Sequence, residues 1–155
     1  MTAARQILPL YDTGAWSLYY RTPSAPGRES DLSYHQLFES FLDEMCQRWQ
    51  APFCDLAANF HRYETEPVQL TALRARADKH RKQLRVGFTV SKRSGITLTL
   101  RQGTRTVYNY LSPLERGPHK ITWPLPKKRG TYQLALSAKS LNGMTSSASS
   151  AVSIP

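Results

Sequence analysis

Residues 84–100 read LRVGFTVSKRSGITLTL, and this stretch sets the expected architecture of the second half of the chain. Apolar and polar residues alternate from Arg85 to Val90 and again from Ile96 to Leu100. Alternation with a period of two predicts half-buried β-strands, and the Lys-Arg-Ser-Gly run between them predicts a turn. We therefore expect two consecutive strands joined by a tight connection.

Further short alternating runs follow this pair of strands. They cover residues 106–110, 119–123, 131–138 and 151–154, and Gly-containing turn residues separate them. A series of short strands of this kind predicts a β-sandwich. Aromatic residues on these strands are either a stacking platform for sugars or bases, or part of the core. We favour the core for all four of them: Tyr108, Tyr110, Trp123 and Tyr132.

Before residue 84 the apolar residues recur at intervals of three and four, which predicts helices. One begins at Leu32, a second runs from Pro52 to about Tyr63, and a weaker third runs from about Gln69 to Gln83. In the second helix we expect Phe53, Leu56, Ala57 and Phe60 to face inward. The Pro-, Gly- and Ser-rich residues 21–31 predict a loop. The expected fold class is α+β in two segregated parts, a helical segment at 1–83 and a β-sandwich at 84–155.

The positive charge belongs to the second half of this 155-residue chain. Residues 1–83 hold 10 Lys and Arg against 10 Asp and Glu, whereas residues 84–155 hold 11 against Glu115 alone. Such a field attracts polyanions, whether nucleic acid, anionic lipid or acidic polysaccharide. The charge does not choose among them, and no nucleic-acid-binding motif is present.

The sequence limits the cellular setting only weakly. No apolar run is long enough to span a membrane, and the N-terminus lacks the apolar core of a signal peptide. Cys46 and Cys54 lie eight residues apart. Two buried free thiols are favoured over a disulfide.

Several chemistries lack their motifs in this chain. There is no G-x-S-x-G nucleophile elbow and no Gly-rich phosphate loop. His35, His61 and His80 do not share a ligand spacing with carboxylates, so no metal site is expected. No cofactor is predicted. The second half has almost no carboxylates and offers no catalytic cluster.

The richest chemistry lies in residues 8–20, LPLYDTGAWSLYY, followed by Tyr34 and His35. The order Leu8-Pro9-Leu10-Tyr11-Asp12-Thr13-Gly14, then Trp16-Ser17-Leu18-Tyr19, then Tyr34-His35 resembles the C-terminal domain of D-glucuronyl C5-epimerases. Pro52-Phe53 stands at about the distance at which that family places a second helix. The likeness covers roughly residues 6–63. The second half resembles the immunoglobulin-like modules appended to bacterial secreted and surface proteins, through SKRSGITLTL and the run from Gly117 to Gly143.

The resemblance implies a site and a reaction. Family members invert C5 of glucuronate units within a polysaccharide of the heparosan or heparan type. Tyrosines act there as acid and base, and the matching positions are Tyr19 and Tyr34. Tyr11, Asp12 and His35 would shape the substrate site, and Arg21 would face the carboxylate. A phenol performs either role if nearby cations stabilise its phenolate.

The sequence also departs from the family. Phe38 stands where a second His is common, and Tyr20 where an acidic residue is usual. The family's catalytic domain is an (α/α) barrel of several hundred residues, so we expect a truncated isomerase that is inactive alone, with a separate chain supplying the rest of the barrel. The alternative is a non-catalytic basic module that binds an acidic glycan or another cell-surface polyanion.

Overall fold

The computed structural model describes residues 2–22 and 25–155, and for Thr2, Ala25 and Pro26 it describes the backbone alone. The chain divides into two compact units, unit 1 at residues 1–67 and unit 2 at residues 68–155. The boundary expected near residue 83 falls at the start of a strand of unit 2. No helix within the described ranges is long and apolar enough to cross a membrane.

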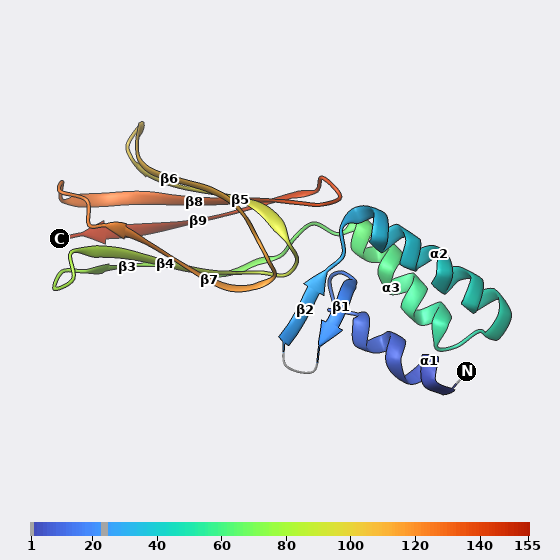
Figure 1. Ribbon diagram of the computed structural model, residues 1–155. Helices are drawn as coiled ribbons and strands as arrows, with labels where there is room; N and C mark the ends of the chain where they lie inside the picture. Colours follow the sequence, from blue (N-terminus) through green and yellow to red (C-terminus); the bar gives the residue numbers. More distant parts are fainter. Residues whose placement is uncertain (1, 23–24) are drawn as a thin grey trace. The chain divides into compact units, whose positions relative to one another are not determined.

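Unit 2 consists of two antiparallel sheets that lie face to face (Figure 1). One sheet has the order β3-β4-β7 and the other β6-β5-β8-β9. The bounds are β3 (Leu70–Asp78), β4 (Gln83–Val90), β5 (Ser94–Gln102), β6 (Arg105–Leu114), β7 (Gly117–Pro124), β8 (Gly130–Ser140) and β9 (Thr145–Ile154). Burial alternates along β4, β5 and β8, which is the period of two that the sequence displays.

The core of unit 2 lies between the two sheets. Val86 and Phe88 of β4 pack in it with Ile96, Leu98 and Leu134 of the facing sheet. The aromatic residues of the strands contribute to this core rather than to an exposed platform, as expected. Tyr132 is buried, and Tyr108 and Trp123 stack on each other with ring centroids 5.3 Å apart while packing against the core.

The α+β assignment is wrong, because strands hold 50% of the residues and helices 27%. The third predicted helix does not exist: residues 70–78 form β3, which pairs with β4. A β-bulge explains the error. The pairing shifts register between Thr71 and Arg74, and Ala72 has a φ of 55°. The extra residue places Leu70 and Leu73, three apart, on the core side, which imitates a helical spacing.

Unit 1 contains α1 (Thr2–Ile7), a 3₁₀ turn η1 (Leu8–Tyr11), the hairpin β1 (Leu18–Thr22) with β2 (Ala25–Glu29), α2 (Leu32–Trp49) and α3 (Phe53–Thr65). The helices predicted from Leu32 and from Pro52 are confirmed, and the expected inward residues of α3 are buried. The loop predicted for residues 21–31 is wrong, because β2 pairs with β1 there. Residues 23 and 24 of that prediction lie outside the described residues.

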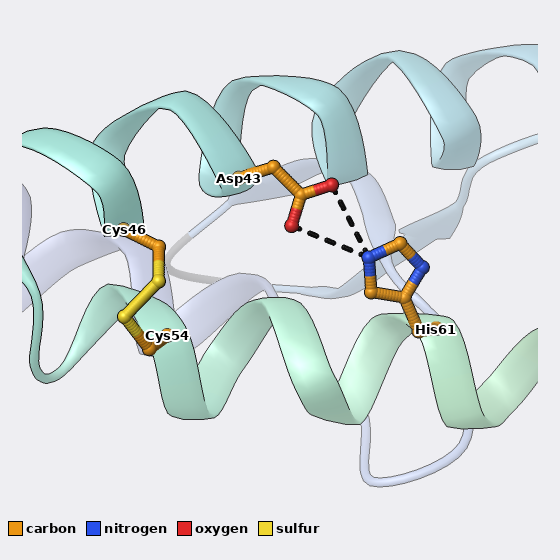
Figure 2. Close-up of a disulfide and its surroundings, with 4 residues drawn as sticks. All are labelled: Asp43, Cys46, Cys54 and His61. Carbon is orange, nitrogen blue, oxygen red and sulfur yellow. Dashed lines mark hydrogen bonds and ion pairs between the residues drawn. A yellow bond between two sulfur atoms is a disulfide. The ribbon is translucent and has the colours of Figure 1, made fainter.

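The two long helices of unit 1 are joined by a disulfide between Cys46 and Cys54 (Figure 2). The preference for free thiols was therefore wrong. The connection between α2 and α3 is short, so the two helices run side by side and bring the Cα atoms within 4.6 Å. In the same pair of helices, Nε2 of His61 on α3 lies 3.2 Å from each carboxylate oxygen of Asp43 on α2 (Figure 2).

Candidate functional site

The Asp12-Thr13-Gly14 motif forms a hydrogen-bonded turn between η1 and β1. The Gly14 N–H donates to Asp12 Oδ1 at 2.7 Å, and the Trp16 N–H donates to Thr13 Oγ1 at 2.9 Å. The Thr13 hydroxyl in turn donates to the Trp16 carbonyl at 2.8 Å. Gly14 has a φ of 80°, a conformation that favours glycine. The turn directs Trp16 into the core, where it is 1% exposed.

His35 is a fully buried side chain of this core, with 0% exposure. Its ring stacks on Trp16 at a centroid distance of 3.8 Å and on Phe60 at 5.1 Å. Nε2 lies 3.3 Å from the Phe60 carbonyl, and Nδ1 lies 2.7 Å from Ser17 Oγ. A carbonyl only accepts, so Nε2 carries the proton and Nδ1 accepts from the Ser17 hydroxyl. His35 therefore positions β1 against α2 and α3 rather than facing solvent.

Asp12 also has a structural contact. The Tyr63 hydroxyl donates to Asp12 Oδ1 at 2.9 Å and approaches Oδ2 at 3.2 Å. Burial first, and then the hydrogen bond to the Asp12 carboxylate, raise the pKa of Tyr63 to about 12. Tyr63 was not among the residues that sequence reasoning selected. Its only sequence signal was a place on the inward face of α3.

Tyr19 and Tyr34, the two residues predicted as acid and base, lie together. Their ring centroids are 4.6 Å apart in an edge-to-face contact, with Tyr19 on β1 and Tyr34 in the first turn of α2. Both rings remain about half exposed, at 51% and 47%. The Asp31 side chain caps α2 by accepting from the Tyr34 N–H at 2.9 Å, which fixes where Tyr34 projects.

The pair borders a pocket of about 410 Å³ in unit 1. Its lining comprises Ile7, Leu8, Tyr11, Leu18, Tyr19, Ser30, Tyr34, Leu37, Phe38 and Phe41. Leu37, Phe38 and Phe41 of α2 supply apolar side chains to the lining, and Tyr11, Tyr19 and Tyr34 supply phenols. A small set of polar groups around an apolar pocket of this volume is typical of small-ligand sites.

The surroundings of Tyr34 favour its neutral phenol. The hydrogen bond with Tyr19, then its negative charge when ionised, then burial and the Asp31 carboxylate raise the pKa of Tyr34. Among the described residues that line the pocket there is no Lys or Arg. Arg21 and Tyr20, both exposed on β1, are outside this lining.

The described part of the chain contains no group of three or more His, Cys, Asp or Glu side chains that would hold a metal ion. Of the six predicted site residues, the structure brings Tyr11, Tyr19 and Tyr34 together at one pocket. The other three do not line it: His35 is buried in the core of unit 1, Asp12 is half-buried, and Arg21 is exposed. The apolar lining residues of α2, among them Leu37 and Phe41, were not predicted as site residues. Apolar residues on an exposed helix face do not form a recognisable sequence motif.

No protein-family description matches the sequence, and no curated protein is similar to it.

Proposed function

We propose that this chain carries the tyrosine part of a D-glucuronyl C5-epimerase-like site and binds glucuronate units of an acidic polysaccharide of the heparosan or heparan type. The ring contact between Tyr19 and Tyr34 supports this most strongly. The two residues come from a strand and a helix that are separated by a hairpin. The sequence resemblance pairs the same two tyrosines as acid and base.

The pocket suits a sugar ring. Aromatic and aliphatic side chains such as Phe38, Phe41 and Leu37 offer a surface to the C–H face of a pyranose. The hydroxyls of Tyr11, Tyr19 and Tyr34 are available to the hydroxyl and carboxylate groups at its edge. Because the Tyr19 and Tyr34 rings contact each other, a sugar first binds beside the pair. Inversion needs the acid and the base on opposite faces of the sugar ring, so the two rings would have to separate around it.

The reaction of the family requires more than two phenols. A base removes the proton at C5, the electron pair moves into the carboxylate as an enolate, and an acid returns a proton to the opposite face. The raised pKa keeps Tyr34 protonated, which suits the donor role. The enolate needs a cation beside the carboxylate, and the described lining of the pocket has none. We therefore expect the cation to come from a partner chain.

Calorimetric titration with an unsulfated heparosan-type oligosaccharide tests the proposal. Wild-type protein is expected to bind, and Tyr19→Phe and Tyr34→Phe are each expected to weaken binding about five- to tenfold, since each removes one hydroxyl contact. Tyr20→Phe is the matched control, because Tyr20 is exposed on the same strand but does not line the pocket.

Equal affinities for all four proteins would show that the tyrosine pair is not the site. A second measurement follows C5 exchange in deuterated water. The chain alone is expected to give none. Exchange that disappears in Tyr19→Phe would show that the chain already supplies the carboxylate-neutralising group.

A further inference from the structure

Unit 2 carries a larger net positive charge than residues 84–155 alone. With its boundary at Val68 it holds 16 Lys and Arg against two acids, Asp78 and Glu115, a net charge of +14. Unit 1 holds five Lys and Arg against nine acids, a net charge of −4. All residues of unit 2 are described.

Two cationic loops that are distant in sequence meet at one end of the sandwich. The turn at residues 79–82 joins β3 to β4, and residues 125–129 join β7 to β8. The Leu125 N–H donates to the Lys82 carbonyl at 2.8 Å, and Gln102 Nε2 donates to the Arg129 carbonyl at 3.1 Å. We call this region the cationic end and define it by Lys79, Arg81, Lys82, Lys127, Lys128 and Arg129, all of them exposed.

Of the two acids of unit 2, only Asp78 lies beside this region, and its ion pair is with Arg85 rather than with the six cations that define the cationic end. Asp78 Oδ2 lies 3.1 Å from Arg85 Nη2, and its Oδ1 accepts from the Arg81 N–H at 3.0 Å. That backbone hydrogen bond is the largest effect on the pKa of Asp78 and lowers it; burial opposes it, and the charge of Arg85 lowers the pKa further. Glu115 pairs with Arg93 at 3.4 Å, between strands that meet at the opposite end of the sandwich.

A pocket of about 490 Å³ opens beside the cationic end. Arg76, Lys79, His80 and Arg85 line it, together with Ala77 and Asp78. Arg76 and Arg85 are directly opposite each other on β3 and β4. Like charges at paired positions disfavour the sheet, so an anion held between them would relieve the repulsion. The pocket is large enough for one sulfate or carboxylate group with part of its sugar.

The surroundings of the cationic end select among polyanions. The exposed large hydrophobic residues of unit 2 are Leu111, on β6, and Met144, in the turn between β8 and β9. Neither lies in the two cationic loops, and Trp123 and Tyr108 are stacked against the core. The two loops contain no Phe, Tyr or Trp on which a base would stack; their only aromatic ring is the imidazole of His80. Their one aliphatic side chain, Leu125, is half-buried, so no fully exposed apolar side chain would insert into a lipid surface.

From these observations we infer that the cationic end of unit 2 is a binding surface for a polysaccharide that bears sulfate or carboxylate groups. This inference rests on the proposed function in one respect only, the chemical class of the polymer. It shares no residue with the tyrosine pocket, so it would gather the chain onto the polymer without taking part in chemistry. Affinity comes from counterion release and is sensitive to salt.

The test compares two variants that lose the same two charges. Lys127→Gln with Lys128→Gln alters the cationic end, whereas Lys120→Gln with Lys139→Gln removes two exposed lysines from strands. With heparin as the probe, we expect the first pair of substitutions to weaken binding about three- to tenfold. The plot of log K against log salt concentration should also become less steep, by about one unit of slope for each lysine in contact with the polymer. The second pair is expected to bind like wild type.

Unsulfated heparosan serves as the second probe. Binding of both polymers with the same dependence on Lys127 and Lys128 shows that carboxylates suffice, and binding of heparin alone shows that sulfates are required. Tyr20→Phe, at an exposed position outside both sites, is expected to leave heparin binding unchanged. The two proposals are distinguishable because loss of the lysines lowers the salt dependence of binding, whereas Tyr19→Phe removes no positive charge and is expected to leave that dependence unchanged. Equal weakening by both lysine pairs, or tighter binding of duplex DNA than of heparin at the same ionic strength, would overturn the inference.

Discussion

The hydroxyl of Tyr63 donates a hydrogen bond to the carboxylate of Asp12 at 2.9 Å and so joins the end of α3 to the turn that follows η1. The two residues are 51 positions apart in sequence. Tyr63 is 2% exposed, and its ring lies near that of Phe60, within the same aromatic cluster as His35. The contact holds the turn that leads into β1, and β1 carries Tyr19.

Replacement of Tyr63 by Phe is expected to lower the free energy of unfolding by about 1–2 kcal/mol. The Asp12 carboxylate keeps its bond to the Gly14 N–H but loses the phenol, while the buried ring is retained. Denaturant titration measures the change. Tyr20→Phe, at an exposed position, should shift stability by less than about 0.5 kcal/mol. Equal stability of the two variants would contradict the role of the Asp12–Tyr63 contact.

Alkaline pH is expected to destabilise the protein through the same residue. The pKa of Tyr63 is raised from 10.0 to about 12 in the folded state, so the folded state holds a proton that the unfolded state releases. Stability from this residue is therefore complete below pH 10 and is lost as the pH rises from 10 to about 12. The pKa of Tyr34 is also raised, so tyrosinate absorbance should reveal a late phase near pH 12 that belongs to Tyr63 and is retained in Tyr34→Phe. If the late phase persists in Tyr63→Phe, the assignment is wrong.

The disulfide is expected to stabilise the α2–α3 pair. Replacement of both Cys46 and Cys54 by Ser frees a short loop in the unfolded state and should lower the stability of unit 1 by about 2 kcal/mol. Unit 2 contains no cysteine, so its stability should not change. Thermal unfolding with and without reductant measures this. The Cys46–Cys54 bond would be contradicted if reductant did not change the thermal stability of the wild type and if that stability equalled the stability of the double variant.

Much of the fold follows from local pattern. The period of two at residues 84–100 predicts β4 and β5, and the spacing of apolar residues predicts α2 and α3, because each element buries one face. β3 was misread because a bulge at Ala72 shifts its inward positions by one residue. β2 was misread because Pro and Gly are typical of loops, although a hairpin at a sheet edge tolerates both.

The site was predictable only in part. The order of motifs predicts that Tyr19 and Tyr34 share one site, and in the structure the two rings are in contact. Periodicity alone gives no indication that Asp12 would meet Tyr63, that Cys46 would meet Cys54, or that residues 79–82 would lie beside residue 125. Such contacts depend on how elements pack, and the sequence around each residue carries no record of a distant partner.

We propose that glucuronate units bind at the tyrosine pair of unit 1. Chemical-shift mapping by NMR with a heparosan tetrasaccharide tests it most directly, at an ionic strength that suppresses binding at the cationic end. We predict perturbations at Tyr11, Tyr19, Tyr34 and Phe38 that need about five- to tenfold more tetrasaccharide to appear in Tyr34→Phe and are unchanged in Tyr20→Phe. Perturbations confined to unit 2, or a pattern in unit 1 that is unchanged in Tyr34→Phe, would contradict the claim.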